Sequence, residues 1–420
     1  MRVWDYIVDL ISEVRADWID WLQDVDLPSS LIVFLDSILG ILLILLMVFP
    51  IVLIFMWVER RFLARFQLRP GPNRCGPLGL LQPIADAIKI MLKEFIAPAK
   101  CDKLVHWIAP VIVFFPALAV FAVIPIGGRA DDLAGTGIGA LADLNIGILY
   151  IVAIGSVGVV GIFMAGWGSN NKYSLLGAMR AVAQLVSYEV PMVLSIMGVV
   201  LIAGSMSLGD IVEQQNVPFM LLQPLGLFIY LMGALAELNR SPMDQLEADS
   251  ELTTGYHTEY SGMKFGMFFV GEYINTVAVA AIISTLFLGG WKVPWNIAFP
   301  VWLFFVMKVF IVFMVIIWMR ATLVRIRIDQ IMSFSWKFLL PMALINIFIT
   351  AGEILIWREW MTGWEYFPWP FMFVNWVVAA ALIIVWSKAF FKLGGGRVEV
   401  REVRAGYSQG LGSNPQAPVS

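Results

Sequence analysis

Nine apolar runs, each about as long as a bilayer is thick, constrain this chain more than any other sequence feature. A helix needs about 20 apolar residues to cross the hydrocarbon core, because each residue advances it by about 1.5 Å. Of the 420 residues, 60% are hydrophobic and only 14% are charged, against about 25% charged residues in soluble domains. The sequence therefore predicts an all-α polytopic membrane protein, since a β-barrel would show short alternating segments instead.

The predicted spans divide the chain into three parts. Residues 1–30 carry seven acidic residues among helically spaced apolar ones, which indicates an amphipathic helix and not a cleaved signal peptide. Residues 31–391 form the transmembrane domain, and residues 392–420 form a polar, glycine-rich tail that we expect to be flexible. The spans are predicted at 31–58, 105–127, 146–166, 179–204, 217–238, 263–289, 297–319, 336–357 and 369–391.

Basic residues predict the orientation, because cytoplasmic loops are enriched in Lys and Arg. With the N-terminus outside and the C-terminus inside, the inner segments hold 22 of the 28 Lys and Arg residues, and the outer segments hold five. The remaining one, Lys308, lies within a span, where it either balances a buried acid or belongs to a relay. The alternation holds through all nine spans and supports both their number and their direction.

The inner region after the first span has two notable parts. Its loop combines five arginines with prolines and glycines that favour fixed turns. These arginines are either an ordinary positive-inside cluster or a contact surface for an acidic partner or lipid phosphates. Residues 77–96 are apolar on one helical face but too charged to span, so we expect a helix in the inner interface. This helix either anchors the fold or floors an opening to the lipid.

Three glutamates are predicted in or at the inner halves of spans. Glu189 and Glu272 lie roughly 12–14 Å below the inner surface, and Glu237 ends the span between them. A charge at this depth costs a few kcal/mol or more, so it usually faces a partner or water. A single one would equally well lock helices together, but three beside an acidic inner loop at 239–262 favour a proton or ion path. Pro191 removes a backbone donor close to Glu189 and favours a kink there.

The sequence predicts no cofactor site in this chain. Cys75 and Cys101 form no CxxC pair, and His106 and His257 lie far apart, so spacing assembles neither an iron–sulfur cluster nor a zinc site. The glycine-rich residues 135–140 follow no strand, and there is no P-loop. We therefore expect any redox cofactor to belong to another chain, and we expect no nucleic-acid partner.

Four long motifs resemble the H-subunit family of respiratory complex I, a proton-pumping NADH:quinone oxidoreductase. They occur in the family's order within about residues 40–355. Their sequences are ERRFLARFQLRPGPNRCGPLGLLQPIADAIKIMLKE, AGWGSNNKYSLLGAMRAVAQLVSYEVPM, AELNRSPMDQLEADSELTTGYHTEYSGMKF and WMRATLVRIRIDQIMSFSWKFLLP. The resemblance implies a multi-pass protein of the bacterial inner membrane.

The same resemblance implies a role for the chain. It would wall a quinone chamber that opens to the lipid between the first span, the sixth span and the interfacial helix. The substrate would be a quinone, ubiquinone or menaquinone, while FMN and iron–sulfur clusters would sit in partner subunits. The implied partners are peripheral subunits at the quinone site, small membrane subunits, antiporter-like subunits and lipid.

Residue roles follow from the resemblance position by position. The acidic proton path comprises Glu189, Glu237, Glu247, Glu251, Glu259 and Glu272. The chamber or its entrance comprises Arg60, Arg61 and Asp86. The chain departs from the common pattern where it reads ELNRSPMDQLEAD instead of ETNRAPFDLPEAE, which alters the chamber wall.

Three alternatives stay open from the sequence. A ferredoxin-driven or hydrogenase-type membrane complex contains the same type of subunit. A freestanding secondary transporter would use Glu189, Glu272 and Lys308 as its coupling site, although the chain shows no inverted repeat. A passive anchor for a peripheral arm would carry nothing through the membrane and would tolerate mutation of the helix glutamates.

Overall fold

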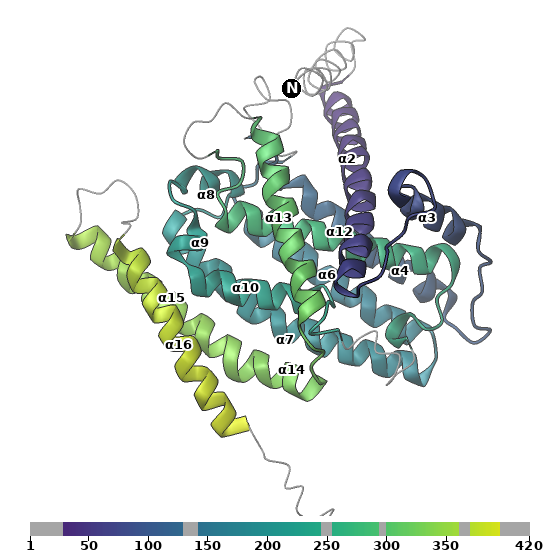
Figure 1. Ribbon diagram of the computed structural model, residues 1–420. Coiled ribbons are helices and arrows are strands. Elements are labelled where there is room, and N and C mark those ends of the chain that lie inside the picture. Colours follow the sequence, from purple (N-terminus) through teal and green to yellow (C-terminus); the bar gives the residue numbers. More distant parts are fainter. Residues whose placement is uncertain (1–27, 129–141, 245–253, 294–299, 361–369, 395–420) are drawn as a thin grey trace, which may run out of the picture. The chain divides into compact units, whose positions relative to one another are not determined.

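The computed structural model describes residues 28–128, 142–244, 254–293, 300–360 and 370–394, and these ranges contain helices and turns but no strand (Figure 1). One compact unit extends to Trp376, and a second begins at Val377 within the last helix. The α-helices are α2 (Ser29–Phe66), α3 (Gln82–Leu92), α4 (Lys103–Ala119), α6 (Gly147–Gly168), α7 (Lys172–Ala203), α8 (Leu208–Gln214), α9 (Phe219–Leu222), α10 (Pro224–Glu237), α12 (Gly262–Phe287), α13 (Val301–Thr322), α14 (Ile328–Phe334), α15 (Leu340–Trp360) and α16 (Pro370–Gly394). Shorter elements are η1 (Pro77–Gly79), η2 (Val120–Ala122), η4 (Gly255–His257) and a π-helical turn (Ser335–Leu339).

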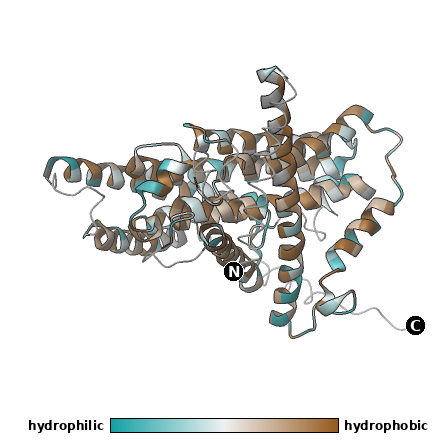
Figure 2. Ribbon diagram, turned by 90° about the horizontal axis from the view of Figure 1, so that it is seen from above, coloured by the Kyte–Doolittle hydropathy of each residue, from teal (hydrophilic) through white to brown (hydrophobic). Residues whose placement is uncertain are grey.

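The apolar helices match the predicted spans. Among the described residues, seven helices are long and apolar enough to cross a membrane. Two shorter apolar helices, Pro224–Glu237 and Pro370–Val385, stand at the predicted fifth and ninth positions. Hydrophobic residues run along the lengths of these helices (Figure 2). The predicted fold class is confirmed: the chain is an all-helical polytopic membrane protein.

The core of the larger unit is built around α12. This helix is 72% buried over its most apolar window, whereas the other spanning helices are between 22% and 50% buried. It packs against α4, α13, α3 and α2. Its small residues Ala278 and Ala280 are fully buried, which lets neighbouring backbones approach closely. The sixth predicted span is therefore the most deeply buried of the spanning helices among the described residues.

The first helix ends later than predicted. The span was expected to stop at residue 58, but α2 continues to Phe66, so Arg60 and Arg61 lie on a helix and not in a loop. The residues of this extension are mostly good helix formers, and the prolines and glycines begin only at Pro70. The extension carries a row of charged side chains out from the apolar part of α2.

The interfacial helix is present but shorter than predicted. Within the predicted 77–96, η1 is followed by α3. Gly79, the last residue of η1, has φ +76°, and a Cβ there would lie 2.2 Å from the Pro72 carbonyl oxygen, so only glycine fits. Ile88 and Met91 on α3 are 52% and 65% exposed. A helix at the lipid interface is expected to combine charged residues with an exposed apolar face, and α3 does so.

Two predicted segments lie largely or wholly outside the described residues. They are the acidic N-terminal helix at 1–30 and the tail after residue 392. The division of the chain into three parts therefore stays a prediction.

Candidate functional site

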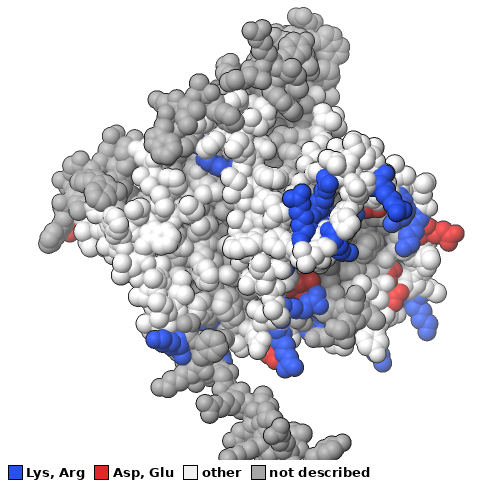
Figure 3. All heavy atoms as spheres, in the orientation of Figure 1, with Lys and Arg blue, Asp and Glu red and all other residues white. Residues whose placement is uncertain are grey.

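A cavity of about 1130 Å³ lies between α2, α3 and α12, with Phe114 of α4 in its wall. Most of its lining is apolar, including Val52, Met56, Ile90 and Phe269. Lys and Arg side chains gather around α3 and the adjoining end of α2 (Figure 3). The cavity is larger than a typical small-molecule pocket of about 300–1,000 Å³, and its combination of apolar wall and charged border suits a long amphipathic ligand.

Two of the three predicted chamber residues meet in the wall of this cavity. Arg60 on α2 forms an ion pair and hydrogen bond with Asp86 on α3, and both side chains line the cavity. Asp86 also accepts a hydrogen bond of 3.1 Å from Gln82. Partial burial raises the pKa of Asp86, but the hydrogen bonds from Arg60 and Gln82 outweigh it and hold the pKa below its usual value. The pair thus joins α2 to α3.

The third predicted residue, Arg61, is not among the residues that line the cavity. Its guanidinium lies 5.2 Å from the ring centroid of Trp57, one turn earlier on α2. The Trp57 indole donates to the Leu78 carbonyl at 3.1 Å. Arg61 therefore packs on α2 beside the connection to α3.

A buried ion cluster at the end of α2 was missed from the sequence. Glu59 is 3% exposed and accepts hydrogen bonds from Arg240 at 3.1 Å and from Arg320. The Arg240 guanidinium also lies 4.7 Å from the Tyr273 ring centroid. Burial lowers the pKa of Arg240, but attraction from Glu59 and then from Tyr273 and Glu272 outweighs it, so the pKa lies above its ordinary value. Arg240 stays charged beside the line of carboxylates.

Three of the predicted proton-path glutamates border two adjoining cavities. The first, of about 50 Å³, is lined by Glu189 and Glu237, and the second, of about 80 Å³, by Glu237 and Glu272. Gly155 and Asn275 line both. A water molecule needs roughly 10–15 Å³ of such space, so each cavity has room for several. The structure therefore brings together three glutamates that lie far apart in the sequence.

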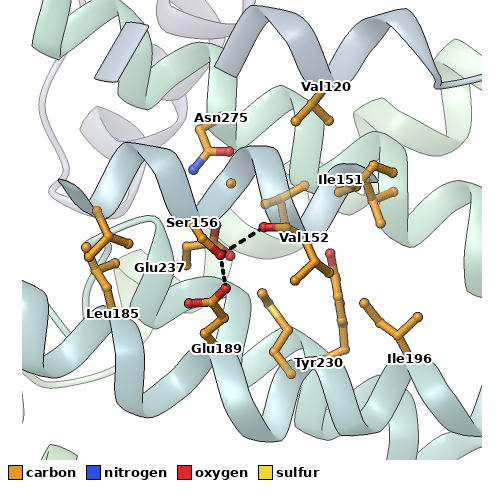
Figure 4. Close-up of a pocket in the computed structure, with 15 residues that line it drawn as sticks. Val120, Ile151, Val152, Ser156, Leu185, Glu189, Ile196, Tyr230, Glu237 and Asn275 are labelled. Carbon is orange, nitrogen blue, oxygen red and sulfur yellow. Dashed lines mark hydrogen bonds between the residues drawn. The ribbon is translucent and has the colours of Figure 1, made fainter. Parts of the chain in front are cut away.

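Each of these glutamates comes from a different helix, and Figure 4 shows two of them, Glu189 and Glu237. Glu189 on α7 faces Ser156 on α6, whose hydroxyl hydrogen-bonds to it and to the Val152 carbonyl. Glu237 is the last residue of α10. A Cβ atom at Gly155 of α6 would lie 3.8 Å from the Glu237 Oε1 atom, so the lack of a side chain at Gly155 leaves room for this carboxylate. Glu272 on α12 accepts a hydrogen bond of 3.3 Å from the Tyr256 hydroxyl.

The other predicted acids lie elsewhere. Glu259 accepts a 2.6 Å hydrogen bond from Asn171, the residue that caps α7, and does not line these cavities. Glu247 and Glu251 fall outside the described residues. Lys308, whose role the sequence left open, donates to the carbonyls of Gly290 at 2.7 Å and Lys292 at 3.1 Å. It holds the turn that follows α12.

Comparison with known proteins supplies the family context. Residues 39–351 match the NADH dehydrogenase family. The H subunit of NADH-quinone oxidoreductase from Dehalococcoides mccartyi (strain CBDB1) is 57% identical over 350 residues, 83% of this chain and 94% of that protein. The protein of the same name from Protochlamydia amoebophila (strain UWE25) is 49% identical over 301 residues, 71% of this chain and 92% of that protein. The one from Carboxydothermus hydrogenoformans is 45% identical over 343 residues, 81% and 95% of the two chains.

Proposed function

The chain belongs to the H-subunit family of NADH-quinone oxidoreductases, and from this premise we propose two linked roles for it. It walls a quinone-binding chamber in the cavity between α2, α3 and α12. It also couples quinone reduction to proton translocation through Glu189, Glu237 and Glu272. Quinone is then the substrate, while FMN and the iron–sulfur clusters belong to partner subunits.

The observation that carries the proposal is the position of the large cavity. It is bounded by the first span, the sixth span and the interfacial helix, the three elements expected to frame a quinone chamber. A quinone joins a polar head to an apolar tail. The apolar side chains of α2, α3 and α12 suit the tail, and the Arg60–Asp86 pair offers polar atoms in the same wall.

A series of charged residues leads from this cavity to Glu272, one of the three glutamates. Arg60 lines the cavity, and its neighbour Glu59 binds Arg240. Arg240 packs on Tyr273 and interacts electrostatically with Glu272. Reduction of a quinone adds negative charge and takes up protons. Because buried charges are weakly screened, a change in the cavity alters the free energy of ionising Glu272.

The surroundings of Glu189 suit both protonation states. An ionised Glu189 accepts a hydrogen bond from the Ser156 hydroxyl. When Glu189 is protonated, it can donate to the Ser156 oxygen, while Ser156 donates to the Val152 carbonyl. A group that can be satisfied in both states can take up and release a proton without rearranging its helix. Water in the two small cavities would link it to Glu237 and Glu272.

The test is Glu237→Gln, because Glu237 alone among the three glutamates borders both small cavities. Glutamine keeps the shape but cannot ionise. We expect the purified complex, reconstituted in vesicles, to assemble normally and to lose NADH:quinone turnover and proton transfer together. Glu213→Gln, at an exposed glutamate of α8, is the matched control. Normal turnover with a normal proton-to-electron ratio in Glu237→Gln would reject the proton-path role.

That experiment also separates the alternatives. A passive anchor tolerates Glu237→Gln. A freestanding transporter with Lys308 in its coupling site is not favoured, because Lys308 donates to the backbone of the turn after α12. A ferredoxin-driven or hydrogenase-type complex would differ in the subunits that purify with this chain. The partners proposed here are peripheral subunits at the quinone site, small membrane subunits and antiporter-like subunits.

We also propose that the N-terminus lies outside and the C-terminus inside, in a bacterial inner membrane. Glu247, Glu251 and Glu259 would then be inner-side members of the proton path. In a variant without Cys75 and Cys101, a membrane-impermeant thiol reagent added outside should label a cysteine at Gly135 but not at Thr253. The reverse labelling pattern would overturn this orientation.

A further inference from the structure

Pro191 leaves one backbone carbonyl of α7 without its helical donor. In an α-helix, each N–H donates to the carbonyl four residues earlier, and proline has no N–H. The carbonyl that loses its donor is that of Ser187, two residues before Glu189. The helix nevertheless continues through Pro191 to Ala203. Because Ser187 is only 5% exposed, its carbonyl needs another donor from within the protein.

That donor comes from the π-helical turn Ser335–Leu339. The Ser335 hydroxyl donates to the Ser187 carbonyl at 2.5 Å, and Ser335 is fully buried. The neighbouring Trp336 indole donates to the Ser187 hydroxyl at 3.2 Å. One residue further along α7, the Tyr188 hydroxyl donates to the Ile331 carbonyl of α14 at 2.7 Å. Two successive residues of α7 are thus held by the segment from α14 through the π turn.

The π-helical turn explains how the adjacent side chains of Ser335 and Trp336 both reach Ser187. A π helix closes its hydrogen bonds over five residues, so it rotates less per residue than an α-helix and keeps neighbouring side chains closer in direction. Pro341 follows two residues after the turn and cannot donate to the Lys337 carbonyl, which favours an irregular turn before it. Pro191 therefore leaves the Ser187 carbonyl without a helical donor, and Pro341 favours the irregular turn that supplies another one.

We propose that Ser335 and Trp336 are positioning residues that clamp α7 at Ser187 and thereby set the position of Glu189. This inference rests on the proposed function of Glu189 and adds a structural control to it. Residues two apart on an α-helix point about 200° apart, so Ser187 and Glu189 lie on nearly opposite sides of α7. The clamp holds one side of the helix, and the Glu189 carboxylate faces Ser156 and the small cavity on the other.

Removing the clamp should displace Glu189 without unfolding the chain. In Ser335→Ala, the Ser187 carbonyl loses its donor, and α7 can rotate or shift to find another. We expect quinone turnover to fall roughly fivefold, which corresponds to the loss of about one buried hydrogen bond. We also expect the pH profile of turnover to shift, because the surroundings of Glu189 change. Ser284→Ala, at a fully buried serine whose hydroxyl donates to the Ala280 carbonyl of its own helix, is the matched control for loss of a hydroxyl.

Restoring the helical donor gives the sharpest test. Pro191→Ala supplies the missing N–H, so Ser335→Ala should lower quinone turnover only slightly in a Pro191→Ala background. A fivefold loss that persists in this background, or the absence of any loss in Ser335→Ala, overturns the clamp. Turnover and the amount of assembled complex are measured for all four combinations.

A second background separates this inference from the proposed function. If Ser335 acts through Glu189, Ser335→Ala should have almost no further effect on turnover in Glu189→Gln. If Ser335→Ala lowers turnover by the same factor in the wild-type and Glu189→Gln backgrounds, Ser335 acts through general packing. That result overturns its positioning role, while the function of Glu189 stands. Normal turnover in Glu189→Gln itself rejects the proposed function of Glu189, and the positioning role fails with it.

Discussion

The acids beside the large cavity and the acids beside the small cavities are held in different ways. Next to the large cavity, Asp86 pairs with Arg60, and Glu59 binds both Arg240 and Arg320. Beside the small cavities, the hydrogen bonds to Glu189 and Glu272 come from the hydroxyls of Ser156 and Tyr256. The first group of acids forms ion pairs, whereas Glu189 and Glu272 accept hydrogen bonds from neutral hydroxyls beside the small cavities, and Arg240 also attracts Glu272.

This difference separates two uses of a buried carboxylate. A carboxylate against a guanidinium favours the ionised form, and removing its charge leaves the cation without a partner. A carboxylate against a hydroxyl can be ionised or neutral, because a hydroxyl both donates and accepts. We therefore expect the first group to hold fixed charges near the quinone and the second to change protonation during turnover.

The largest effect is expected at Glu59. Glu59→Gln keeps the side-chain shape but leaves Arg240, which is 7% exposed, without its ion-pair partner. Breaking a buried pair on one side costs about 3–5 kcal/mol. We expect little assembled complex on a native gel and a lower unfolding temperature. Asp244→Asn is the control, because its partner Arg325 is 41% exposed and such pairs contribute about 1 kcal/mol or less. Similar losses in the two variants would mean that burial of the Glu59 pair adds nothing to its contribution to stability.

The next effect is expected in turnover and not in assembly. Glu189→Gln and Glu272→Gln should each assemble normally and lower quinone reduction and proton transfer together, by roughly tenfold. The double variant should be little worse than the worse single one, because groups that act as a unit are not additive. Poor assembly together with a normal proton-to-electron ratio would place both acids with Glu59 as structural charges. Assembly, turnover and proton transfer should be measured in the same membranes.

The sequence predicted the parts of the fold that depend on local pattern. Apolar runs of spanning length correspond to an apolar helix at each of the nine positions, because a bilayer demands both length and hydrophobicity. The end of α2 was placed too early because the prediction followed hydropathy, and hydropathy falls at Glu59 while helix propensity does not. The same error placed Glu59 at the edge of an arginine-rich loop.

The contacts of the site depend on partners that are distant in the sequence. Glu59 meets Arg240 and Arg320 across 181 and 261 residues, and no local spacing indicates such pairs. The joining of Glu189, Glu237 and Glu272 was suggested by their depth and by family resemblance, but the two small cavities that they border, with Gly155 of α6 in the lining of both, come from tertiary packing. Lys308 shows the converse, since a lone charge in a span suggested either a partner for a buried acid or a relay member, whereas in the structure it donates to the carbonyls of the turn after α12.

The smallest effect concerns the wall of the large cavity and contains no change of charge. Ala87 on α3 lines the cavity, so Ala87→Phe should narrow the space beside α2 and α12. A long-tailed quinone must lay its tail along this apolar wall, whereas a short-tailed one need not. We expect kcat/KM to fall roughly threefold for the long-tailed quinone, a steric cost below about 1 kcal/mol, with little change for the short-tailed one.

Ala85 supplies the matched control on the same helix, because it lies two residues from Ala87 and does not line the cavity. Ala85→Phe adds the same ring to α3 and should slow both quinones equally or not at all. If both substitutions slowed both quinones alike, α3 would act only as an anchor of the fold. Selective slowing of the long-tailed quinone by Ala87→Phe alone would instead place the tail against α3. The Arg60–Asp86 pair would then lie beside the bound quinone. Its charges would stay fixed during turnover, whereas we expect the glutamates beside the small cavities to change protonation.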